Sequence, residues 1–126
     1  MRLLLGLFIA MVLAITFGLW VNHALDQAAQ ELNVNIKQVS EKIHQANWSE
    51  AKQAVQQLEE EWQEIASWWP LVLDHQEIDN IEFALAKLKE YVAAEDSMMS
   101  QAQLAELKLM ILHLPEKEAL TIKNIL

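Results

Sequence analysis

Residues 3–21 read LLLGLFIAMVLAITFGLWV, and no formally charged residue occurs between Arg2 and Asp26. At a helical rise of about 1.5 Å per residue, this stretch extends roughly 28 Å, close to the ~30 Å hydrocarbon core of a bilayer. It is longer than the roughly 7–15 apolar residues of a secretory signal peptide, and no small-x-small cleavage site follows it. We therefore expect a retained membrane anchor over residues 1–24 and a second domain over residues 25–126.

The positive charges indicate an orientation for this anchor. Arg2 precedes the apolar stretch, and no Lys or Arg follows until Lys37. Because cytoplasmic flanks of membrane spans are enriched in Lys and Arg, we expect a cytoplasmic N-terminus. The sequence thus predicts a single-pass protein of the cell membrane, with the lipid bilayer as a partner and the C-terminal domain outside the cytoplasm.

The amino-acid composition limits the classes of partner that the domain after the anchor can bind. The chain of 126 residues has no cysteine and a net charge of −9. A domain without disulfides must be held together by its own hydrophobic core. Residues 25–126 are enough for one such domain. Nucleic acid is not expected as a partner, because binding it requires a basic face. We expect the acidic run from Glu50 to Glu82 to be a solvated outer face, with docking to a basic partner or loose Ca²⁺ binding as the alternative.

The breaker residues predict an all-α fold. Both glycines, Gly6 and Gly18, lie in the apolar stretch, and the only prolines are Pro70 and Pro115. Sheets need many turns, which Gly and Pro commonly supply, whereas helices need few. We expect an N-terminal transmembrane helix that continues into an antiparallel bundle of three to four helices.

Helical periodicity divides the bundle. The first helix is predicted to run without interruption to about Ala46, and Asn47 with Glu50 forms a capping-box-like start for the second. Further helices are predicted over residues 71–94 and 98–113, with Pro115 ending the last one. The apolar tail residues Leu120, Ile122, Ile125 and Leu126 are expected to pack back on the bundle. The predicted inner-face residues are Leu25, Leu32, Ile36, Val39, Ile43, Ala51, Val55, Leu58, Trp62, Ile65, Trp69, Ile78, Ile81, Leu85, Leu88, Val92, Leu104, Leu107, Ile111 and Leu114.

The stripe of the second helix has two interpretations. Its apolar residues repeat at alternating spacings of four and three, as in a coiled-coil seam, until Pro70 interrupts them. We favour the inner face of a bundle within one chain, because an antiparallel bundle needs the same stripe. An intermolecular coiled coil is the alternative.

Several aromatic and polar residues together resemble a known group of proteins. These are Trp48, Trp62 and Trp69, the stretch His75-Gln76-Glu77-Ile78-Asp79, and the terminal Asn124-Ile125-Leu126. Over nearly the whole chain they resemble an uncharacterised bacterial family of short, single-span helical membrane proteins from Gram-positive spore-formers. The resemblance implies an architecture and no activity.

Small residues line one side of the apolar stretch. Gly6, Ala10, Ala14 and Gly18 recur every fourth residue and therefore lie along one helical face. Faces of this kind allow close helix–helix approach in lipid, so we expect a homodimer or another membrane protein as a partner. The alternative is that Gly and Ala are simply common in membrane spans.

One acidic cluster could bind a metal ion. His75 and Asp79 are four residues apart on one predicted helical face, and Glu82 follows on the same face. A divalent cation held by these three residues would make the domain a ligand- or cation-binding module. Two simpler interpretations are acidic side chains placed by the helix dipole and a histidine packed beside the tryptophans.

Trp68 and Trp69 beside the predicted helix break form a candidate anchor for a partner.

The sequence contains no Gly-rich phosphate loop, no G-x-S-x-G or H-E-x-x-H motif and no cysteine nucleophile, so neither an enzyme nor a cofactor is predicted. We expect a membrane-anchored structural or protein-interaction component, with the cation-binding module as the alternative.

Overall fold

The fold consists of helices and the turns that join them. The computed structural model describes the backbone of residues 1–69 and 74–125 and the side chains of residues 1–69 and 74–114. Within these residues the elements are α1 (Arg2–His44), α2 (Trp48–Ala66), α3 (His75–Ala93) and α4 (Ser97–Ile125). The predicted all-α fold, with a long apolar first helix packed into a bundle, is confirmed.

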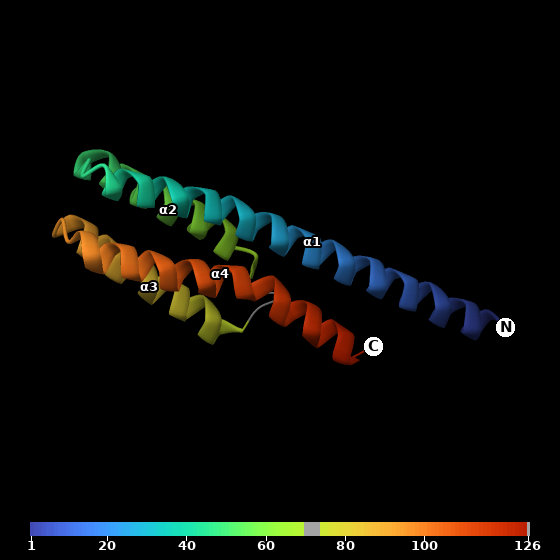
Figure 1. Cartoon of the computed structure of the whole chain (residues 1–126). Coiled ribbons are helices and arrows are strands. Elements are labelled where there is room, and N and C mark those ends of the chain that lie inside the picture. The colour runs from blue at the N-terminus through green and yellow to red at the C-terminus, as the bar shows by residue number, and fades with distance from the viewer. Residues whose placement is uncertain (70–73, 126) are drawn as a thin grey trace.

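The four helices pack in antiparallel order. α1 contacts α2 and α4, and α3 contacts the same two helices from the opposite side. Figure 1 shows the α1–α2 and α3–α4 turns side by side at one end of the bundle, which we call the distal end. An ion pair between Lys52 and Glu95 joins the two hairpins there (3.6 Å). The opposite, proximal end is the one from which α1 projects.

Helix α1 combines two environments in one uninterrupted rod. Its 43 residues extend about 65 Å. The first large side chain buried in the bundle is that of Val21, and burial then recurs on one stripe as far as Ile43. Residues before Gly18 are exposed on every side in the part of the chain that the structure describes. The predicted continuation of the apolar helix into the bundle is thus confirmed.

One hydrophobic core fills the bundle. All four helices contribute to it, and Trp62 and Trp69 are its largest fully buried side chains. Every residue predicted to face inward is buried. Burial of a large apolar side chain contributes roughly 1.5–3 kcal/mol. The apolar stripes on the facing sides of the helices can therefore hold the bundle together without disulfides.

The two distal turns have the same construction. Ala46 and Glu95 adopt positive φ angles of 55° and 57°. The following residues, Asn47 and Asp96, each donate a backbone N–H to the carbonyl five residues back at 3.0 Å, which is the hydrogen-bond pattern of a Schellman motif. The same two residues cap the next helix, because their side-chain oxygens accept from backbone N–H groups three residues on.

The predicted capping box is only half formed. The side chain of Asn47 accepts from the backbone N–H of Glu50 at 3.3 Å, as expected. The carboxylate of Glu50 pairs with Lys42 at 2.7 Å, and the backbone N–H of Asn47 bonds to the Lys42 carbonyl. The Schellman motif therefore uses the donor that the Glu50 side chain would have taken.

Two predicted helix boundaries were wrong. α3 begins at His75 and not at Leu71, because Asp74 is extended (φ −65°, ψ 138°) and its side chain accepts from the backbone N–H of Gln76. Pro115 does not end α4, which continues to Ile125. An interior proline removes one backbone hydrogen bond and costs about 3 kcal/mol, which the helix tolerates at this position. The predicted packing of the tail side chains lies outside the described residues.

Candidate functional site

The exposed first half of α1 is the largest candidate functional surface. By length and composition α1 is the one helix among the described residues that could cross a membrane, and only 6% of its most apolar window is buried. The core helix of a soluble protein passes the same length test but is mostly buried. The exposed large side chains in this half include Leu4, Phe8, Leu13, Phe17 and Trp20.

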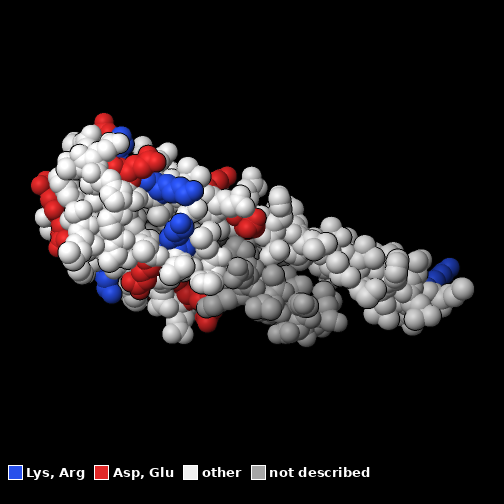
Figure 2. Space-filling view, viewed as in Figure 1, with Lys and Arg blue, Asp and Glu red and all other residues white. Residues whose placement is uncertain are grey.

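The distribution of charge also distinguishes the exposed first half of α1 from the bundle. Figure 2 shows the charged side chains gathered on the bundle, while the projecting half of α1 is uncharged in this view apart from a basic side chain at its tip. Within this half, the hydroxyl of Thr16 donates to the carbonyl of Val12 at 2.8 Å. A polar group in lipid needs such an internal partner, because no water is present to satisfy it.

The small residues of α1 form an open strip. Gly6, Ala10 and Ala14 are exposed, and Gly18 is half-buried. A Cβ atom added at Gly6 would meet no atom within 4 Å, so this position is open in the single chain. The predicted helix-association face therefore has room for a neighbour at its N-terminal end.

The tryptophans form a cluster at the proximal end. The rings of Trp62 and Trp69 meet edge to face with centroids 5.3 Å apart, and those of Trp68 and Trp69 do so at 6.0 Å. Trp69 is 0% exposed, so it belongs to the core and the expectation of an exposed anchor at this residue was wrong. The spacing explains the difference, because Trp69 continues the buried stripe of α2 through Trp62 and Ile65, whereas Trp68 points beside it and is half-buried.

The predicted metal ligands do not assemble into a site. His75, Asp79 and Glu82 all lie on α3 and all are exposed. Among residues 1–69 and 74–114, no group of three His, Asp or Glu side chains is placed to hold a metal ion. The alternative of a histidine packed beside the tryptophans was also wrong, because His75 is the first residue of α3 and is solvent-exposed.

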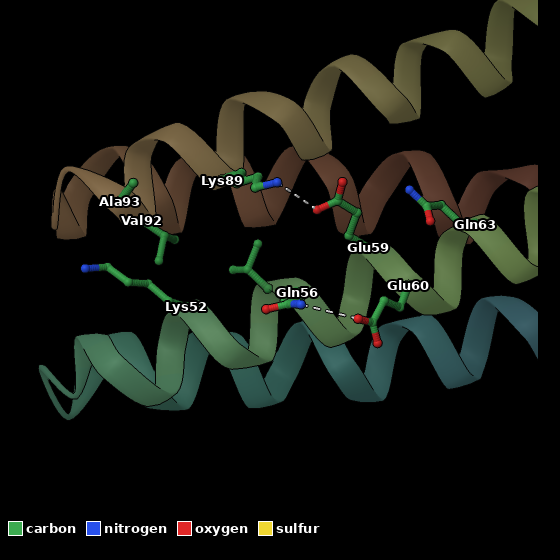
Figure 3. A pocket seen from close by; sticks show the side chains of 9 residues that line it. Lys52, Gln56, Glu59, Glu60, Gln63, Lys89, Val92 and Ala93 are labelled. Carbon is green, nitrogen blue, oxygen red and sulfur yellow. Dashed lines mark hydrogen bonds and ion pairs between the residues drawn. The ribbon is translucent and has the colours of Figure 1, made fainter.

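A groove between α2 and α3 brings together charges of both signs (Figure 3). Lys89 of α3 pairs with Glu59 at 3.3 Å, and the amide of Gln56 donates to Glu60 at 3.4 Å. Val55 and Val92 also line this open groove. These ion pairs could not be predicted from the acidic run alone, because the lysines that pair with it, Lys42 and Lys89, belong to other helices.

A second set of acids converges between α1 and α2. Burial raises the pKa of Glu61 above its ordinary value, and the negative charges of Glu31 and Glu64 raise it further. Glu31 lies thirty residues earlier in the sequence, so only the antiparallel packing of α1 and α2 reveals this repulsion. The acidic run is thus partly neutralised by lysines on one side and repelled by like charge on the other.

Comparisons with known proteins identify a family and no activity. No curated protein and no solved structure matches the chain. The sequence model of a domain of unknown function, DUF4363, matches residues 19–125, which include all of α2, α3 and α4 and the whole buried half of α1. On this match over most of its length, the chain belongs to the uncharacterised DUF4363 family.

Proposed function

We propose that this protein is a single-pass membrane-anchored structural or protein-interaction component that holds its helical bundle outside the cytoplasm. The observation that carries the proposal is the continuity of α1, which is exposed and apolar on every side before Gly18 and packed into the bundle core from Val21 onward. The exposed half needs an apolar surrounding, and a bilayer supplies one of matching thickness.

The packing of α1 also favours an anchor that is retained. In a cleaved signal peptide the apolar stretch would leave the protein, with cleavage just after it. In this chain Val21 and Leu25 are core residues, and the helix passes through this region without a break. Cleavage near residue 21 would remove the start of the core stripe. The cytoplasmic location of the N-terminus rests on Arg2 and the positive-inside rule.

The role that we propose is non-catalytic and consists of contact with other proteins. The strip of Gly6, Ala10, Ala14 and Gly18 would pack against a second copy or another membrane protein, since small residues let two helix backbones approach closely. We further propose, from the resemblance described above, that the protein lies in the cell membrane of a Gram-positive, spore-forming bacterium.

Alkaline extraction of membranes tests the anchor. Peripheral proteins are released by this treatment, whereas a chain whose apolar helix spans the bilayer stays in the pellet. We expect the full chain in the pellet, and recovery in the supernatant would contradict the anchor.

Crosslinking in native membranes tests the association face. We expect a homodimer or one defined heterocomplex, and we expect the double variant Gly6→Leu, Ala10→Leu to weaken it several-fold because the added side chains separate the backbones. The matched control is Phe8→Leu with Val12→Leu, which changes the opposite side of the same helix. Equal trapping in both variants would remove the association face from the proposal.

A further inference from the structure

The antiparallel alignment of α1 with α2 determines how far along α1 the proximal end lies from the apolar stretch. Lys42 pairs with Glu50 near the distal end. Seven residues further along each helix, from 42 to 35 and from 50 to 57, Asn35 and Gln57 line one groove. Four residues beyond these, the negative charge of Glu31 raises the pKa of Glu61. The two helices therefore keep one antiparallel register over this whole length.

The same register places Trp68 close to the end of the apolar stretch. Seven residues beyond Glu61 is Trp68, two residues past the last residue of α2, and seven residues before Glu31 on α1 is Ala24. Ala24 is three residues past Val21, which corresponds to about 4.5 Å along the helix. The headgroup layer on each side of a bilayer is roughly 5–8 Å thick, so a bundle held on an unbroken α1 has Trp68 within that layer.

The chemistry of this end suits that layer. Trp20 is 63% exposed and lies one turn below Ala24, and Trp68 is half-buried. Tryptophan is enriched at membrane–water interfaces because its ring is apolar while its N–H can bond to water or headgroup oxygens.

We propose that the proximal end of the bundle rests on the bilayer that holds α1, with Trp68 inserted among the lipid headgroups, so that no stalk separates the bundle from the membrane. The inference rests on the proposed membrane anchor and adds a lipid contact made by the bundle itself. The contact follows from the continuity of α1, because an unbroken helix keeps the proximal end at a fixed distance from the membrane-spanning residues.

Site-specific labelling of the full chain tests this contact. The chain has no cysteine, so single cysteines can carry an environment-sensitive fluorophore at one site at a time. The sites are Ser67→Cys, which is exposed beside Trp68, Leu13→Cys in the apolar half of α1, and Gln45→Cys in the exposed distal turn. Each labelled protein is reconstituted in phosphatidylcholine–phosphatidylglycerol vesicles with or without a quencher lipid. The quencher is near the headgroup for the Ser67→Cys and Gln45→Cys labels and in the acyl chain for the Leu13→Cys label.

We expect quenching at Leu13→Cys and Ser67→Cys, and at least about threefold less at Gln45→Cys. Quenching at Leu13→Cys alone would overturn the headgroup contact and leave the anchor intact. A label at Ser67→Cys that is shielded from water but not quenched by lipid would assign this end to a protein partner and would also overturn it. Quenching at neither Leu13→Cys nor Ser67→Cys would contradict the anchor itself.

A matched pair of tryptophan variants assigns the contact to Trp68. Trp48 is also half-buried on α2 but lies at the distal end. We expect Trp68→Ser to reduce lipid quenching of the Ser67→Cys label about twofold and Trp48→Ser to leave it unchanged, with helix content by circular dichroism equal in both. An equal effect of the two variants would contradict the assignment to Trp68.

Discussion

The two halves of α1 differ in both composition and surroundings. Up to Trp20 the helix is almost entirely apolar and, apart from the half-buried Gly18, exposed, whereas from Val21 its apolar residues form one stripe that is buried by α2 and α4. Polar side chains such as Gln38 and Glu41 occupy the rest of the second half. The comparison shows that the projecting half of α1 is apolar all round, whereas the half packed in the bundle has one apolar stripe and a polar remainder.

The largest effect expected from this comparison comes from truncating one leucine in each half. Leu32 is 0% exposed and Leu13 is 65% exposed in the chain. We expect Leu32→Ala to lower the free energy of unfolding by about 3 kcal/mol, because it leaves a cavity in the core. Leu13→Ala should change it by less than about 0.5 kcal/mol. Urea unfolding in micelles, followed by the fluorescence of the tryptophans, measures both, and equal effects would contradict the division of α1.

A smaller effect is expected where the buried half of α1 ends. Ala46 has a positive φ of 55°, a conformation that favours glycine. We expect Ala46→Gly to raise the free energy of unfolding by about 1 kcal/mol, because it relieves this strain in the Schellman motif. The control is Ala86→Gly on the exposed face of α3, which should lower stability by about 1 kcal/mol. A loss of stability in both variants would contradict the turn geometry.

The smallest effect concerns the acids beside the buried half. The raised pKa of Glu61 means that the folded protein binds a proton more readily than the unfolded chain. Ionised Glu61 therefore costs stability above its folded pKa, and this cost disappears as the pH falls below the ordinary value of 4.5. We expect Glu61→Gln to stabilise the bundle at pH 7 by roughly 0.3 kcal/mol, because solvent screens these charges. Its advantage should vanish at acidic pH, and a gain that grows toward low pH would contradict the repulsion.

The regular parts of the fold were predictable from the sequence. The stripes on each helix, the Asn47 cap and the continuity of α1 follow from local spacing, and the structure has each of them. These features depend on helical periodicity and on one side chain bonding to its own backbone, which are local properties. Local patterns therefore predicted the fold class and the inner face of every helix.

The errors arose where tertiary packing decides. α4 continues through Pro115, although the loss of one backbone hydrogen bond at a proline predicts a helix end there. Trp69 was predicted both as an inner-face residue and as a partner anchor, and its burial as a continuation of the α2 stripe past Ala66 decides for the first. The proximity of Glu31 to Glu61 and the pairing of Lys89 with Glu59 join residues thirty positions apart, so no local pattern encodes them.

The most direct test of the central claim is a spin-label scan along α1 in the full chain reconstituted in vesicles. Single labels at residues 3–20 should be accessible to oxygen dissolved in lipid and protected from a water-soluble nickel reagent, since a bilayer surrounds this half. From residue 22 onward, nickel accessibility should rise and fall with a helical period of about 3.6 residues as positions alternate between core and water. Access of the nickel reagent throughout residues 3–20, or one helical period across both halves, would contradict the account.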